Sequence, residues 1–98
     1  MNASVAMTEP LRIPSTDPSL PGHFPGNPIV PGVVLLDRIA AALERQGGRL
    51  ARIGVVKFMT PLRPDEDATL SIARDGLRIS FRIDRGDAPI LRGEGELA

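Results

Sequence analysis

The sequence predicts an α+β fold in which an antiparallel β-sheet wraps around one central apolar helix. Two observations predict it: one long apolar segment without glycine or proline (residues 33–46), and four later segments of β-branched or large apolar residues, several alternating with charges. A lone apolar helix can bury its surface only against the sheet. We expect residues 1–98 to form a single domain, because this length supports one core and is too short for two.

The chain before the helix is expected to be mostly irregular. Residues 1–8 show no periodicity and are predicted to form a loose end, followed by a short edge strand over Leu11–Ile13. Six prolines between positions 14 and 31 exclude a helix and argue against a central strand. This stretch is therefore predicted to be a long, stiff loop.

A helix is predicted from Gly32 to Gln46, because the segment ends in two glycines. Apolar residues occupy positions 33–36 and 39–43, so they surround the helix axis, and such a helix is buried on most sides. An ionised Asp37 is costly in this setting, and its neighbours three and four positions away offer no ion pair. We therefore expect Asp37 to be buried or to face an external partner.

Four antiparallel strands are predicted after the helix, within residues 49–64, 67–76, 77–87 and 88–97. A tight hairpin over Arg74–Leu77 joins the second to the third, because Asp-Gly supplies the positive φ angles that such turns require. One face of the third strand is expected to be buried and the other to be exposed to solvent. The residues predicted to be buried there are Leu77, Ile79, Phe81 and Ile83.

The composition restricts the function classes. Twelve basic residues balance twelve acidic ones and are interspersed with them, which indicates neither nucleic acid nor a membrane surface as a partner. One histidine and no cysteine offer few ligands to a metal, and no cofactor is expected. The first ten residues do not resemble a signal peptide, and no segment approaches the roughly 20 apolar residues of a membrane span, so the cytoplasm is the default location. Only three residues are aromatic, so the core has few large rings to anchor it, and a partner subunit would help to stabilise the fold.

His23 and Asp37 are the residues most indicative of function. His23 is the only histidine, and it exchanges protons near neutrality more readily than any other side chain type. It lies in the segment GHFPGNPIVPGVVLLD, and Asp37 follows it by fourteen positions. Taken alone, His23 could be a loop residue bonded to backbone, Asp37 an exposed helix residue, and Pro31 and Gly32 ordinary helix-start residues. Together they indicate a site.

The segment Gly22–Asp37 resembles the active-site segment of the β-hydroxyacyl-acyl-carrier-protein dehydratases, which have the hot-dog fold. In that family a histidine opens the same His-Phe-Pro-Gly run, a Pro-Gly pair starts the central helix, and a Glu or Asp follows fourteen positions after the histidine. The later stretch VVKFMTPLRPDED is similar to the family's Lys-Phe strand and Pro-bounded turn. The chain also resembles the short single-domain relatives associated with aryl polyene and related lipids.

The resemblance implies reversible removal of water from a β-hydroxyacyl thioester, which leaves a trans-2-enoyl thioester. His23 would take the α-proton, and Asp37 would donate a proton to the departing β-hydroxyl or orient it, for which burial should hold it partly protonated. The backbone N–H of Gly32 would stabilise the thioester oxygen. Substrate binding is implied for Phe24, Pro25, Gly26, Pro31 and Val33.

The resemblance also implies partners. In the family the histidine and the acid come from different subunits of a dimer, so a monomer would have no complete site. A homodimer, or a heterodimer with a related hot-dog subunit, is therefore expected. The acyl carrier protein that bears the substrate is acidic and would meet basic residues at the tunnel mouth, for which Lys57 and Arg63 are the candidates.

Two other functions remain compatible with the sequence. Thioester hydrolysis on the same fold would need a water positioned by Asp37, and the His-Phe-Pro-Gly run argues against it. A non-catalytic acyl-binding or assembly subunit of a larger dehydratase would fit the short chain, whereas the presence of both His23 and Asp37 counts against it. Isomerisation of the new double bond also stays open, because the Asp resembles isomerising dehydratases and its surroundings resemble the others.

Overall fold

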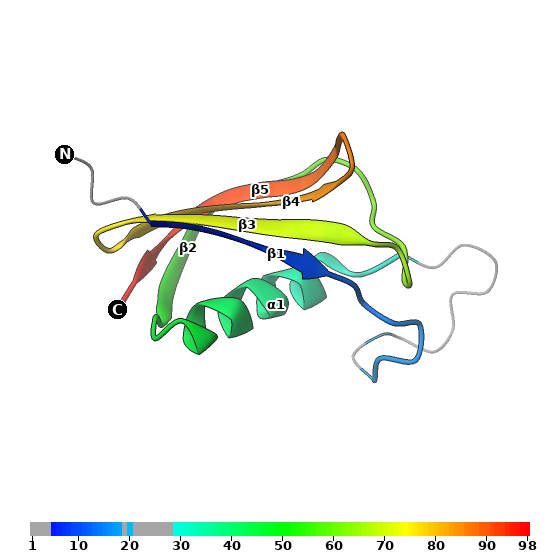
Figure 1. Ribbon diagram of the computed structural model, residues 1–98, viewed down its shortest axis with the longest axis horizontal. Coiled ribbons are helices and arrows are strands. Elements are labelled where there is room, and N and C mark those ends of the chain that lie inside the picture. The colour runs from blue at the N-terminus through cyan, green and yellow to red at the C-terminus, as the bar shows by residue number, and fades with distance from the viewer. Residues whose placement is uncertain (1–4, 19, 21–28) are drawn as a thin grey trace.

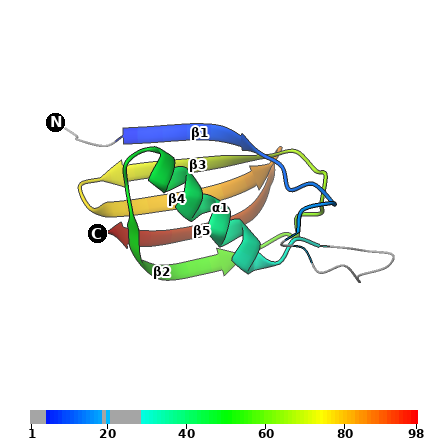
Figure 2. The same cartoon turned by 90° about the horizontal axis from the view of Figure 1, so that it is seen from below.

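The described part of the chain contains one helix and five strands, which form a single antiparallel sheet in the order β1-β3-β4-β5-β2. The computed structural model describes residues 5–18, 20 and 29–98. The sheet curves over the helix (Figure 1), which crosses the strands on one face of the sheet (Figure 2). The predicted architecture is confirmed. The bounds are β1 Val5–Leu11, α1 Gly32–Arg45, β2 Leu50–Phe58, β3 Ala68–Asp75, β4 Arg78–Arg85 and β5 Ala88–Leu97.

Helix α1 ends as the two glycines predict. Gly47 has a φ of 82°, and the N–H of Gly48 donates to the carbonyl of Leu43 at 2.9 Å, which closes the last turn. The helix is one residue shorter than predicted, because Gln46 is its C-terminal cap. No helix in the described residues is long and apolar enough to cross a membrane.

The predicted burial of α1 on most sides is wrong for the single chain. Five residues face the sheet and are buried, whereas Val33 is 67% exposed and Asp37 is also exposed. The reason is geometric, since the sheet lies against one side of the helix only. The buried residues are Val34, Leu35, Ile39, Ala42 and Leu43.

In strands β3 and β4 buried residues alternate with more exposed ones, and the buried side chains form the centre of the core. In β4, Ile79, Phe81 and Ile83 are buried and the residues between them are exposed, as predicted. Leu77 is an exception at 58% exposure, because it lies in the turn between β3 and β4. In that turn only Gly76 takes a positive φ, of 63°, whereas the prediction gave one to Asp75 as well. One class of two-residue hairpin turn needs a positive φ at only one of its two central residues, and Gly76 supplies it.

Strand β1 begins and ends earlier than predicted. The prediction of a loose end over residues 1–8 is wrong for residues 5–8, and the strand Leu11–Ile13 is replaced by Val5–Leu11. The backbone of β1 pairs with β3 over its whole length. Pro10 is tolerated because β1 is an edge strand. Ile13 is fully buried beyond the end of the strand.

Strand β2 lies at the other edge of the sheet, and none of its residues is buried. Ile53, Val55 and Phe58 are 38%, 68% and 55% exposed. Among the described residues β2 pairs with β5 alone, so its outer edge is open. An open edge strand that exposes apolar side chains is a surface on which another chain can pair.

Candidate active site

The structure places four of the eight predicted site residues. His23, Phe24, Pro25 and Gly26 lie outside the described residues. The other four lie on or beside the first turns of α1. Pro31 is the N-terminal cap, with φ −60° and ψ 144°, and the helix begins at Gly32. The prediction that the Pro-Gly pair starts the helix is confirmed.

The start of α1 presents main-chain donors. The carbonyl of Pro31 accepts the N–H of Val34 at 3.0 Å and that of Leu35 at 3.4 Å. Within the part of the chain that the structure describes, no backbone acceptor is bonded to the N–H of Gly32 or Val33. The first turn holds no acidic side chain. N–H groups at a helix start and the helix dipole can act together on a negatively charged oxygen.

Gly32 lies directly against the ring of Phe58. A Cβ at position 32 would be 2.6 Å from Cε1 and 2.7 Å from Cζ of Phe58, closer than real contacts allow. Glycine therefore lets the end of β2 approach the start of α1. Phe58 was not among the predicted site residues, because it lies 26 positions away in the sequence (58 minus 32) and only the fold brings it here.

A cavity of about 410 Å³ adjoins Gly32. Its size is within the range of small-molecule sites, and its lining is apolar except for the hydroxyl of Thr60. Such a cavity fits an extended apolar group whose polar end reaches the helix start. The lining residues are Ile29, Val30, Pro31, Gly32, Leu35, Phe58, Met59, Thr60, Pro61, Leu62 and Ile90.

A second, larger groove of about 540 Å³ is lined mainly by exposed or half-buried residues of all five strands. No residue of the helix start is in its lining, so we take the smaller cavity, which Gly32 lines, as the candidate site. Lys57 lines this groove with Arg82 and Arg92, and it directly precedes the cavity residue Phe58, so its contact with a carrier protein stays a prediction. The other basic candidate, Arg63, directly follows the cavity residue Leu62.

Asp37 is exposed, so its predicted burial is wrong in the single chain. It follows the exposed Val33 by about one helical turn and shares the side of α1 that the sheet leaves open. The neighbouring Arg38 forms an ion pair with Asp17, which precedes the His23 segment. The alternative expectation for Asp37, an external partner, stays a prediction.

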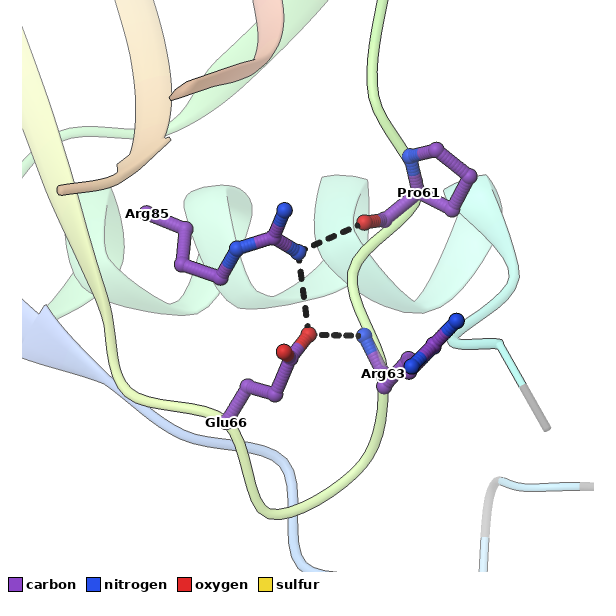
Figure 3. Close-up of polar contacts among 4 residues, drawn as sticks. All are labelled: Pro61, Arg63, Glu66 and Arg85. Atoms are coloured by element: carbon purple, nitrogen blue, oxygen red, sulfur yellow. Dashed lines mark hydrogen bonds and ion pairs between the residues drawn. The ribbon is translucent and has the colours of Figure 1, made fainter. Parts of the chain in front are cut away.

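The loop between β2 and β3 forms one wall of the cavity and is held by polar contacts (Figure 3). The Arg85 guanidinium donates to the carbonyl of Pro61 and to the carboxylate of Glu66, both at 3.0 Å. Glu66 also accepts the main-chain N–H of Arg63 at 2.8 Å. The hydrogen bond from Arg63, and then the charge of Arg85, hold the pKa of Glu66 below its ordinary value.

Acid is expected to weaken this loop. Hydrogen bonds from Ser15 lower the pKa of Asp65 as Arg63 lowers that of Glu66, from ordinary values of 3.8 and 4.5. A lowered folded-state pKa contributes stability that is present above the unfolded value and is lost as pH falls through the folded value. The thermal midpoint should therefore hold down to about pH 5 and fall below about pH 4. Asp65→Asn/Glu66→Gln should flatten that fall, and an unchanged slope in this variant would contradict the assignment.

The sheet around one helix, with an apolar cavity at the helix start, defines a protein of the hot-dog fold. The dehydratase heterocomplex ApeI:P from Xenorhabdus doucetiae superposes with a TM-score of 0.81 at 28% identity, covering 95% of this chain and 87% of that one. The chain belongs to the ApeI-like family, described as ApeI dehydratase, whose model matches residues 2–94. The predicted fold and the resemblance to dehydratases are confirmed.

Curated relatives agree with the family. The 3-hydroxyacyl-acyl-carrier-protein dehydratase FabZ of Thermomicrobium roseum is 33% identical over 92 residues, which cover 84% of this chain and 60% of the relative. The FabZ of Caldanaerobacter subterraneus subsp. tengcongensis is 30% identical over 89 residues, covering 81% and 63%. The chain thus spans less than two thirds of the length of these relatives.

Proposed function

We propose that the protein removes water from β-hydroxyacyl-acyl-carrier-protein thioesters to form trans-2-enoyl thioesters, in the synthesis of fatty acids or polyene-type lipids. One observation supports the proposal above all: in a chain of the ApeI-like dehydratase family, Gly32 at the start of α1 lines an apolar cavity. The thioester oxygen would meet the helix start, and the acyl chain would occupy the cavity.

The proposed chemistry assigns one step to each group. Neutral His23 takes the α-proton, and the electron pair of that C–H bond forms the new double bond as the β-carbon–oxygen bond breaks. Asp37 supplies or orients the proton with which the hydroxyl leaves as water. Negative charge on the thioester oxygen in the transition state is stabilised by the Gly32 N–H and the dipole of α1. The reaction needs no cofactor or metal in this scheme.

The proposed site is completed by a second subunit. Asp37 and Val33 point away from the sheet of their own chain, and β2 leaves an apolar edge open nearby. A partner placed there would bury both features and could bring its own His23 to Asp37. A homodimer is the simplest form. The heterocomplex state of the Xenorhabdus doucetiae relative supports a related hot-dog subunit as the alternative partner.

The proposed substrate carrier is an acidic acyl carrier protein, as the names of the curated relatives indicate. Arg63, which directly follows the cavity residue Leu62, and Lys57, which directly precedes Phe58, are the basic residues proposed to meet it. The proposed compartment is the cytoplasm, and the proposed residues for the substrate itself remain Phe24, Pro25, Gly26, Pro31 and Val33.

The test is to incubate the purified protein with enoyl and β-hydroxyacyl thioesters of both coenzyme A and a carrier protein. Enoyl absorbance and intact product mass would be followed together. Interconversion of the two thioesters supports the proposal. Release of free thiol would favour a thioesterase, and no reaction, together with binding to a larger dehydratase, would favour the assembly subunit.

A further inference from the structure

The larger groove, of about 540 Å³, crosses all five strands of the sheet. Most of its side chains belong to the outward face of the strands, as Arg82 does, which is exposed between the buried Phe81 and Ile83. Successive strand residues point to opposite faces, so these side chains point away from the core. We propose that the groove is a docking surface for an acidic amphipathic helix of a partner protein. The proposal goes beyond the dehydratase function and does not depend on it.

One wall of the groove is a row of directly paired residues. In β5, Arg92 pairs with Arg82 of β4 on one side and with Lys57 of β2 on the other. These three residues are named here the cationic row. Arg82 also pairs with Ser71 of β3, which pairs with Thr8 of β1. Directly paired residues share a face of the sheet, so the wall continues as hydroxyl groups where its positive charges end.

The cationic row lacks counter-charges within the chain. Like charges directly opposite each other on neighbouring strands destabilise a sheet. Arg82 forms an ion pair with Asp84 at 3.2 Å, whereas neither Lys57 nor Arg92 forms one with any described residue. Both of these side chains are exposed. An anionic partner would supply the charge that the chain itself does not.

Another row on the same face of the sheet arranges its charges in the opposite way. Negative and positive side chains alternate there across β3, β4, β5 and β2, in the order Asp75, Arg78, Glu96 and Arg52. Arg52 and Glu96 form an ion pair at 3.0 Å. The sheet thus pairs its charges internally in that row and fails to do so beside the groove. Where a chain departs from a stabilising pattern at one place, a function at that place is the expected reason.

The other wall of the groove is made mostly of small side chains. It comes from residues two positions along each strand from the first wall: Ala6, Ala73, Ser80, Glu94 and Val55. Of these five, Glu94 alone is charged. Small side chains let a rod-shaped group approach the strands closely. The groove therefore offers positive charge along one side and a smooth, largely uncharged surface along the other.

The spacing of the cationic row fits a helix that lies across the strands. Neighbouring strands are about 4.8 Å apart, so the row offers one positive charge about every 4.8 Å, and five strands span about 19 Å. A helix rises about 5.4 Å per turn, so carboxylates one turn apart would meet successive cations, and about 13 residues would span the groove. Docking of an amphipathic helix in a groove is a recurrent mode of recognition. A second copy of this same face would instead bring two cationic rows together and add repulsion.

The experiment uses a synthetic amphipathic helical peptide of about 14 residues, with one Glu per turn along one side and Ala and Leu beside it. Its counterpart carries Gln in place of every Glu. Fluorescence anisotropy would measure the Kd of each labelled peptide for the purified protein. We expect the Glu peptide to bind about tenfold more tightly than the Gln peptide at low salt, and we expect high salt to remove most of the difference.

Variants of the protein separate charge from shape. Arg92→Gln removes the central charge of the row and should weaken binding of the Glu peptide about fivefold. Arg49→Gln is the matched control, because Arg49 is exposed, lies outside the groove lining and loses the same charge. It should stay within about twofold of the parent. Ala73→Gln keeps the charge but fills the groove, and should weaken both peptides about fivefold.

A second readout needs no ligand. Because Arg92 lies between two other cations, Arg92→Gln should relieve repulsion and raise the thermal midpoint by about 3 °C at low salt. High salt should shrink this gain, because it screens exposed charges. Arg49→Gln should leave the midpoint within about 1 °C of the parent.

Three results would overturn the docking surface, whatever the thermal midpoints show. The first is equal binding of the two peptides by the parent, or an equal Kd in Arg92→Gln and Arg49→Gln. The second is binding of inorganic tripolyphosphate without binding of the Glu peptide, which would identify a phosphate site. The third is a change in sedimentation confined to Arg92→Gln, which would assign the groove to a second copy of the chain. Enoyl hydration enters none of these measurements, so the proposed dehydratase function stands or fails separately.

Discussion

Neither His23→Ala nor Asp37→Ala is expected to hydrate an enoyl thioester alone, whereas an equimolar mixture of the two should regain about a quarter of the parent activity. Random exchange makes half of the dimers mixed, and each mixed dimer has one site with both groups. The physical reason is that Asp37, on α1, is exposed in the single chain. The initial rate after subunit exchange measures the recovery.

The matched control is a mixture of each variant with itself under the same exchange conditions, which should stay inactive. Sedimentation would show whether mixed dimers form. Two results would contradict the shared site: a stable monomer with full activity, or mixed dimers that form and remain inactive. Activity of His23→Ala on its own would instead remove His23 from the mechanism.

Gly32→Ala is expected to lower kcat/KM for enoyl hydration about 100-fold while costing only about 1 kcal/mol of stability. The new methyl group would lie 2.6 Å from Cε1 of Phe58. Because Phe58 is 55% exposed, its ring can move aside, so the fold tolerates the change. The displaced ring and the methyl group would then occupy space in the cavity that Gly32 and Phe58 line, where the proposed thioester would meet the helix start.

Gly48→Ala, at the other end of the helix, is the matched control, since its nearest atom would be at 3.4 Å, an ordinary contact. It should change kcat/KM by less than about twofold. Gly32→Ala/Phe58→Leu should recover part of the lost activity by clearing the mouth. If the activity lost in Gly32→Ala were fully explained by the fraction of the protein that is unfolded, the glycine would serve the fold alone.

Several parts of the protein could be predicted from local sequence patterns. The helix from Gly32, its end at the two glycines, and the strands β2 to β5 follow from periodicity and turn chemistry within a few positions. The family resemblance rested on one contiguous segment, and the family match confirms it. The helix-start part of the site, Pro31 and Gly32, was predicted for the same reason.

Other features depend on residues far apart in the chain. Strand β1 has no alternating pattern and contains Pro10, and it exists because β3 offers a partner along its length. The cavity was invisible in the sequence, because Phe58 meets Gly32 only after β2 has paired with β5. The loop between β2 and β3 likewise joins Asp65 to Ile13 and Ser15 across about fifty positions.

Sequence patterns alone were enough to predict the secondary structure after residue 31, the family, and the chemistry to expect from His23, Asp37 and Gly32. The tertiary structure was needed to see that the single chain leaves Asp37 exposed. Apolar periodicity shows that a helix has surface to bury, but it does not say how much of that surface its own sheet can reach. Here the sheet covers one side of α1, which leaves Asp37 and Val33 exposed in the single chain.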